Sequence, residues 1–166
     1  MKPEGRHPVI FDYPPEDELR VRDYLRTLLA HIAKQKQGLR VKHIDLFDLV
    51  LNYLVSRKLL DKAIQMQQEK GDEALKKALA GPLHETKLGG VFAEVAQAEQ
   101  HDLVIVSGVG SAWPLLRPHS LLNNLQSVMG KTPLVMFYPG KYDGQSLRLF
   151  GKLTSKIYYR AFRLVP

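Results

Sequence analysis

The stretch LVIVSGVGSAWPLLRPHSLLNNLQ, residues 103–126, passes from a strand through a loop into a helix. Its first residues are apolar on both alternating faces, which is typical of a strand in a parallel sheet covered on both sides. Two glycines, a serine and the only tryptophan of the chain follow, and a leucine-rich segment comes next. The stretch therefore predicts a strand over 102–108, a loop, and a helix over 119–129.

The segments on either side continue this alternation of apolar strands and amphipathic helices. Strands are predicted over 8–13, within 39–47 and over 133–140, and helices over 14–38, 46–58, 59–80 and 87–100. Asp45 is the expected N-cap of the helix over 46–58. Gly71–Asp72 is expected to break the helix over 59–80, and Gly89–Gly90 to mark a start or a kink. This order predicts one α/β domain over 1–166, a doubly wound, mostly parallel sheet covered by helices.

The C-terminal segment has a different pattern. SLRLFGKL, residues 146–153, and IYYRAFRLV, residues 157–165, alternate apolar and polar residues and lie a few residues apart. Two alternating runs with a short connection are typical of an antiparallel hairpin. The sequence therefore predicts a C-terminal antiparallel hairpin that extends or flanks the sheet.

Composition limits the class of protein. The chain has 166 residues and no cysteine, which excludes disulfides and thiolate metal sites and is compatible with a cytoplasmic location. No apolar run is long enough for a membrane span.

The formal net charge is +7, and residues 130–166 hold seven basic residues against one acidic residue, Asp143. A basic end on a nearly neutral body indicates an acidic protein partner or nucleic acid, although an exposed hairpin with solvated charges explains it as well.

No known catalytic motif occurs at the carboxyl ends of the predicted strands, where a parallel sheet usually binds its ligands. GVGSAW is neither a dinucleotide fingerprint nor a phosphate-binding loop, no GxSxG occurs around Ser111, and the six histidines lack metal-ligand spacing. The sequence therefore predicts no catalytic residue, no metal and no cofactor. A degenerate nucleotide-binding domain without chemistry of its own stays open as an alternative.

Two features indicate binding instead. Trp113 is either an interaction anchor or a ring that covers the end of the sheet, and Arg117 lies near a helix start, where a cation suits a partner carboxylate. Basic and aromatic residues also alternate in the tail, as Arg148, Phe150, Lys152 and as Tyr158, Arg160, Phe162. By strand alternation each trio is expected to lie on one face of a strand, and such a basic and aromatic face favours single-stranded nucleic acid. The nucleic-acid alternative therefore rests on Arg148, Lys152, Lys156, Arg160 and Arg163.

Several linked motifs carry a resemblance over residues 8–166. GVGSAWPLLRPHSLLNNLQ, LVMFYPGKYDGQSLRLFGKL and YYRAFRLVP resemble the BrxB family of BREX (bacteriophage exclusion) phage-defence systems, as do IFDYPPEDELRVRDYL and VKHIDLFDLVL. Members usually carry a further segment before the first strand, so a truncated or short form is expected here.

The resemblance implies a small non-catalytic adaptor subunit. A PglZ-type protein is the partner it implies first, with a BREX ATPase and a methyltransferase as further candidates. No catalytic residue is defined for the family. The most distinctive surface is expected at the strand ends and includes Ser111, Trp113, Arg117, His119, Tyr142 and Asp143.

Overall fold

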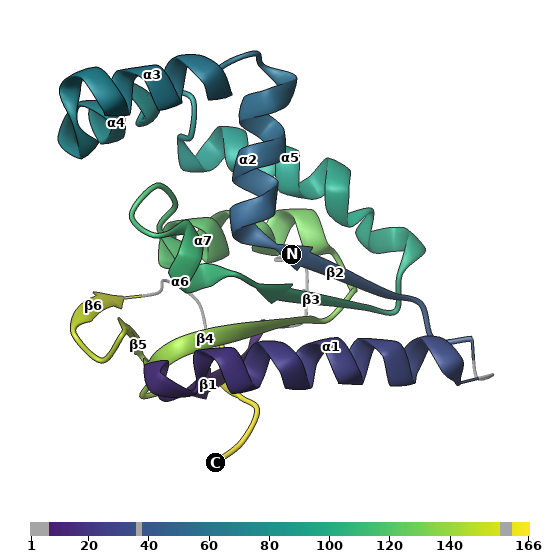
Figure 1. Cartoon of the computed structure of the whole chain (residues 1–166). Helices are drawn as coiled ribbons and strands as arrows, with labels where there is room; N and C mark the ends of the chain where they lie inside the picture. The colour runs from purple at the N-terminus through teal and green to yellow at the C-terminus, as the bar shows by residue number, and fades with distance from the viewer. Residues whose placement is uncertain (1–6, 36–37, 157–160) are drawn as a thin grey trace.

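The computed structural model describes residues 7–35, 38–156 and 161–166 (Figure 1). The strands are β1 (Val9–Tyr13), β2 (Val41–Asp45), β3 (Leu103–Ser107), β4 (Leu134–Tyr142), β5 (Ser146–Leu149), β6 (Leu153–Lys156) and β7 (Phe162–Arg163). The α-helices are α1 (Glu18–Lys34), α2 (Leu46–Ser56), α3 (Leu60–Lys70), α4 (Asp72–Leu79), α5 (Glu85–Ala96), α6 (Val109–Ala112) and α7 (Pro118–Met129). Short 3-10 helices cover Pro15–Asp17 (η1) and Ala98–Gln100 (η2).

The sheet is mostly parallel, as predicted. Its main path runs β2-β3-β4-β1-β7, and every pairing along this path is parallel. β4 lies in the middle, between β3 and β1. β5 and β6 extend the far end of β4 as antiparallel strands. The predicted doubly wound α/β fold with a C-terminal antiparallel hairpin is confirmed.

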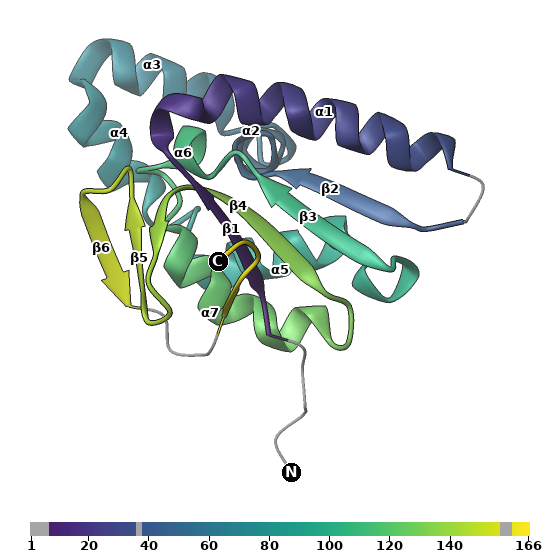
Figure 2. The same ribbon diagram turned by 90° about the horizontal axis from the view of Figure 1, so that it is seen from below.

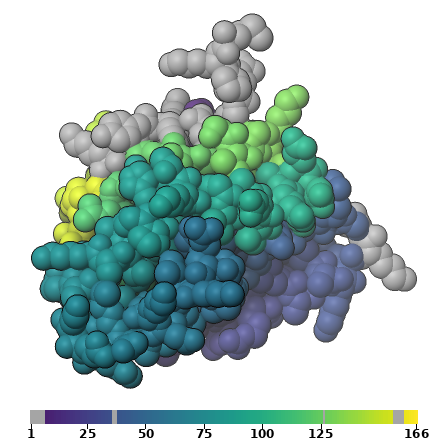
Figure 3. Space-filling model, turned by 90° about the horizontal axis from the view of Figure 1, so that it is seen from above, coloured from purple at the N-terminus to yellow at the C-terminus, as the bar shows by residue number. Residues whose placement is uncertain are grey.

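Helices cover both faces of the sheet unequally (Figures 1 and 2). One face carries α1, which packs Leu25 against Ile105 and Phe137 of the sheet. The other face carries α2, α5 and α7, whose apolar residues form the larger core cluster. Figure 3 shows the outer side of this second layer, where the helices between residues 50 and 100 cover most of the surface. The fold therefore has three layers, with the larger core on the α7 side.

The start of α2 fixes the geometry between two neighbouring strand ends. Oδ1 of Asp45 accepts hydrogen bonds from the backbone N–H of Phe47 at 2.9 Å and of Asp48 at 3.1 Å, which confirms Asp45 as the N-cap. Gly108 follows β3 and has φ of 73°. A Cβ atom at Gly108 would lie 2.3 Å from Oδ1 of Asp45. Only glycine therefore allows the turn after β3 to approach the capped end of α2.

The predicted hairpin has different strands from those expected. Phe150 and Gly151 adopt φ of 55° and 71°, so a tight turn interrupts the stretch 146–153 and β5 pairs with β6 within it. Phe162 and Arg163 pair with β1 in parallel instead. The prediction that Arg148, Phe150 and Lys152 share one strand face is therefore wrong, because the last two lie in the turn.

Two helix predictions from glycine positions had different outcomes. The break at Gly71–Asp72 is confirmed, since α3 ends at Lys70 and α4 begins at Asp72. Gly89–Gly90 does not mark the start of a helix, because α5 begins earlier, at Glu85. A Cβ atom at Gly89 would lie 3.6 Å from Cβ of Asn124, so this glycine lies at the contact between α5 and α7.

We expect Gly108→Ala to lower the free energy of unfolding by about 4 kcal/mol, because left-handed strain and a clash with the capping carboxylate add together. Gly38→Ala is the matched control, since Gly38 has φ of 67° but open space around its Cα. Its expected loss is about 1 kcal/mol, from strain alone. Urea denaturation measures both variants, and equal losses would contradict the role assigned to the Asp45–Gly108 contact.

Candidate functional site

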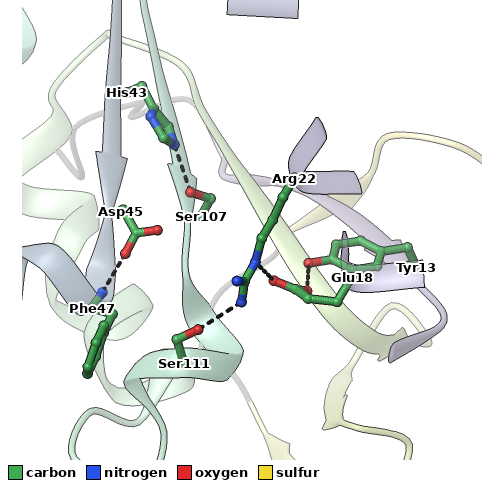
Figure 4. Close-up of polar contacts among 8 residues, drawn as sticks. All are labelled: Tyr13, Glu18, Arg22, His43, Asp45, Phe47, Ser107 and Ser111. Carbon is green, nitrogen blue, oxygen red and sulfur yellow. Dashed lines mark hydrogen bonds and ion pairs between the residues drawn. The ribbon is translucent and has the colours of Figure 1, made fainter. Parts of the chain in front are cut away.

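The ends of the parallel strands meet at one edge, where polar side chains form two small networks (Figure 4). Arg22 of α1 donates hydrogen bonds to Oε1 of Glu18 at 2.8 Å and to the hydroxyl of Ser111 at 3.0 Å. The hydroxyl of Tyr13 donates to Oε2 of Glu18 at 2.5 Å. Ser111 is thus brought to the predicted edge, but its hydroxyl accepts a hydrogen bond from α1.

The second network joins β2 and β3. Nε2 of His43 lies 2.7 Å from Oγ of Ser107. Burial lowers the pKa of His43, although Asp45 and Asp48 oppose that shift. Among the described residues, no carboxylate forms a hydrogen bond to His43, and Oδ1 of Asp45 serves as the cap of α2. The pair therefore lacks the third group that orients the base of a catalytic triad.

A pocket of about 310 Å³ opens on the α7 side of the same edge. We call it the Trp113 pocket. Its lining comes from α4, the loop before α7, the start of α7, β4 and the β5–β6 ribbon. The lining residues are Lys76, Trp113, Pro114, Arg117, Pro118, His119, Tyr138, Leu149, Lys152, Leu153, Thr154 and Ser155.

Trp113, Arg117 and His119 are the predicted site residues that the structure brings together here. The side chain of Trp113 is 39% exposed, and its ring meets the ring of Phe150 edge to face with centroids 6.0 Å apart. One side of the indole is therefore packed while part of it stays accessible. The role of Trp113 as an interaction anchor stays a prediction.

Basic side chains dominate the charge of this pocket. Lys76, Arg117 and Lys152 line it, and none of its lining residues is acidic. His119 adds little charge at neutral pH, because burial and then the neighbouring Arg117 lower its pKa, against the opposite effect of Glu85. The pocket therefore presents three cations to whatever enters it.

Tyr138 of β4 is the least exposed aromatic residue of the pocket lining. Its side chain is 1% exposed, and its hydroxyl makes no hydrogen bond to any residue in the described part of the chain. Burial raises the pKa of Tyr138 well above the usual range, so the hydroxyl stays protonated and acts as a donor. Neither Tyr138 nor Lys76 was predicted as a site residue. Only Tyr138 could have been found from the sequence, because it lies near the end of a predicted strand.

Tyr142 and Asp143 lie away from the Trp113 pocket. Tyr142 is 2% exposed, its hydroxyl donates to the carbonyl of Ala161 at 2.9 Å, and its N–H donates to Oδ2 of Asp12 at 3.0 Å. The expectation that Tyr142 lies on the surface is wrong, because β4 runs two residues beyond Gly140 and buries this ring. Asp143 is exposed and organises the turn before β5.

The basic tail does not form one face in the described part of the chain. Arg163 donates to Oδ1 of Asp12 at 2.9 Å, and this carboxylate is only 4% exposed. Arg148 is exposed on β5, whereas Lys152 lines the Trp113 pocket. Arg160 and the side chain of Lys156 lie outside the described part. The predicted nucleic-acid residues are therefore divided between different surroundings.

No group of three or more histidine, aspartate or glutamate side chains in the described part of the chain is placed to hold a metal ion. No helix within it has the length and apolar character needed to cross a bilayer.

Comparisons with known proteins give consistent matches. The profile of the family described as "BREX protein BrxB" matches residues 42–164. A curated BREX protein BrxB of Escherichia coli O9:H4 (strain HS) is 44% identical over 157 residues, which cover 95% of this chain and 77% of that protein. Another, of Bacillus cereus (strain H3081.97), is 35% identical over 158 residues, covering 94% of this chain and 82% of that protein. No solved structure matches.

The turn at Asp143 generates a pH prediction. Hydrogen bonds from the backbone N–H of Ser146 and Gln145, and from the Ser146 hydroxyl, lower the pKa of Asp143 to about 2 from 3.8. A depressed folded-state pKa stabilises the fold above the unfolded value, and the contribution disappears as pH falls through the folded value. We expect the difference in Tm between the unaltered chain and Asp143→Asn to be full at about pH 6 and to shrink toward about pH 2. Calorimetry across this range checks it, and a constant difference would contradict it.

Proposed function

The chain belongs to the BrxB family of BREX proteins, and from this premise we propose that it is a non-catalytic adaptor that binds a PglZ-type partner. Membership gives the chain a role in BREX phage defence, with other BREX subunits as its partners. The proposed adaptor acts in the cytoplasm, with which a chain without cysteine is compatible. A BREX ATPase or methyltransferase is a second candidate for direct contact.

The Trp113 pocket is the observation that carries this proposal. A partly exposed tryptophan lies beside Arg117, and tryptophan and arginine are the residues most enriched among interface hot spots. Arg117 forms no ion pair with any described residue, so its guanidinium is available to a partner. We infer that this pocket is the centre of the partner interface.

The two alternative functions have less support. Arg163 is neutralised by Asp12, and the described cations of the tail do not share one surface, which weakens a nucleic-acid interface along the tail. A degenerate nucleotide site is weakened by the turn after β1, which has no glycine to approach a phosphate and whose Glu16 forms no ion pair with a described residue.

We expect the unaltered chain to co-elute with the PglZ-type protein of the same BREX system in size-exclusion chromatography with light scattering. Trp113→Ala and Arg117→Glu should each raise the Kd by about 30-fold or more, because each removes a hot-spot side chain. Arg26→Glu is the matched control, since Arg26 is exposed on α1 at the opposite face of the sheet.

The same experiment separates the alternatives. Duplex DNA replaces the protein partner in a parallel run, and co-elution with DNA alone would reject the adaptor in favour of nucleic-acid binding. An equal loss of partner binding in Arg26→Glu would show that charge in general, rather than the Trp113 pocket, drives association.

A further inference from the structure

We propose that the Trp113 pocket binds a carboxylate-bearing segment of the partner protein, whose neighbouring apolar residue packs against Trp113. The inference rests on the proposed function, because it gives the chemistry of the partner surface that the pocket meets. It is carried by the charges of the lining, by the unpartnered hydroxyl of a largely buried tyrosine and by the mixed character of the walls.

The charges that line the pocket are complementary to an anion. Lys76 comes from the last turn of α4, Arg117 from the N-cap of α7, and Lys152 from the turn between β5 and β6. Three distant segments thus bring like charges to one pocket that no acidic side chain lines. Glu85 lines the adjoining pocket instead, beside Arg117. Like charges held together repel, so an anion in the pocket relieves this repulsion.

The hydroxyl of Tyr138 adds a hydrogen-bond donor. Tyr138 is 1% exposed and lines the pocket, and its hydroxyl has no hydrogen-bond partner among the described residues. A protonated phenol that lacks a partner donates readily to a carboxylate oxygen. The start of α7 contributes in the same direction, since no side chain caps it and Pro118 and His119 line the pocket.

The pocket suits a protein carboxylate better than a nucleic-acid phosphate. Much of the wall is apolar, from Trp113, Leu149 and Leu153. The cations converge on one pocket of about 310 Å³ rather than following a track, and Arg148 and Arg163 do not extend it. A backbone of repeated phosphates requires a continuous basic groove. A single acidic side chain with an apolar neighbour fits the pocket better.

The test measures binding of the purified PglZ-type protein to the full chain by titration calorimetry at low and high NaCl. We expect Arg117→Met and Lys152→Met each to raise the Kd by about tenfold or more, because each leaves a partner carboxylate unpaired. The dependence of the Kd on salt should become shallower in both variants. Arg26→Met is the control, with the Kd and salt dependence of the unaltered chain.

Tyr138→Phe separates binding from folding. The substitution removes only a hydroxyl that bonds to no described residue, so the Tm should stay unchanged while the Kd rises by about threefold or more. A fall in Tm together with an unchanged Kd would show that the hydroxyl has a structural role and overturn its part in the site.

The only tryptophan of the chain is itself a reporter. Labelled with 5-fluorotryptophan, the chain gives one ¹⁹F resonance, which should shift with the partner protein and stay unchanged with oligothymidylate. A shift with oligothymidylate that Arg117→Met abolishes would reassign the pocket to nucleic acid.

If the partner binds and the methionine variants bind as tightly as the unaltered chain, only this inference fails. If the unaltered chain does not bind the partner, the proposed function fails and the inference falls with it.

Discussion

The parallel pairing of β4 with both β3 and β1 is the constraint on which the rest of the structure depends. Met136 lies opposite Val106 on one side and Ile10 on the other. Because these strands run in one direction, the carboxyl ends of β1, β2, β3 and β4 meet at one edge. The capped start of α2, the turn at Gly108 and the start of α7 all lie there, and the β5–β6 ribbon extends β4 beyond it.

Local sequence patterns were sufficient for most of the fold. The strand at 103–107 was predicted within a residue at each end, because its apolar run has polar or glycine residues on both sides. Asp45 was correctly predicted as a cap, since capping depends on neighbours two and three residues away. The strand pairing of the C-terminal segment was not predicted correctly. The sharp turn at Phe150–Gly151 lies inside an alternating pattern, and the pairing of Phe162 with β1 joins residues near the two ends of the chain.

The sequence predicted only those residues of the candidate site that are close to one another along the chain. Trp113, Arg117 and His119 lie within seven residues of one another, so a single loop places them at the same pocket. Lys76 and Tyr138 come from α4 and β4, and no periodicity in the sequence links them to that loop. The pocket is therefore a product of tertiary packing, with its cations assembled from three segments around a loop that the sequence had already singled out.

The most direct test of the central claim, that the Trp113 pocket is the centre of the partner interface, is hydrogen–deuterium exchange with and without the PglZ-type protein. Partner binding should protect backbone amides around the pocket, in residues 113–121 and 152–155. Amides in α1, on the opposite face of the sheet, should exchange as in the free chain. Protection confined to α1 or to the free edge of β2, with no change around Trp113, would contradict the account.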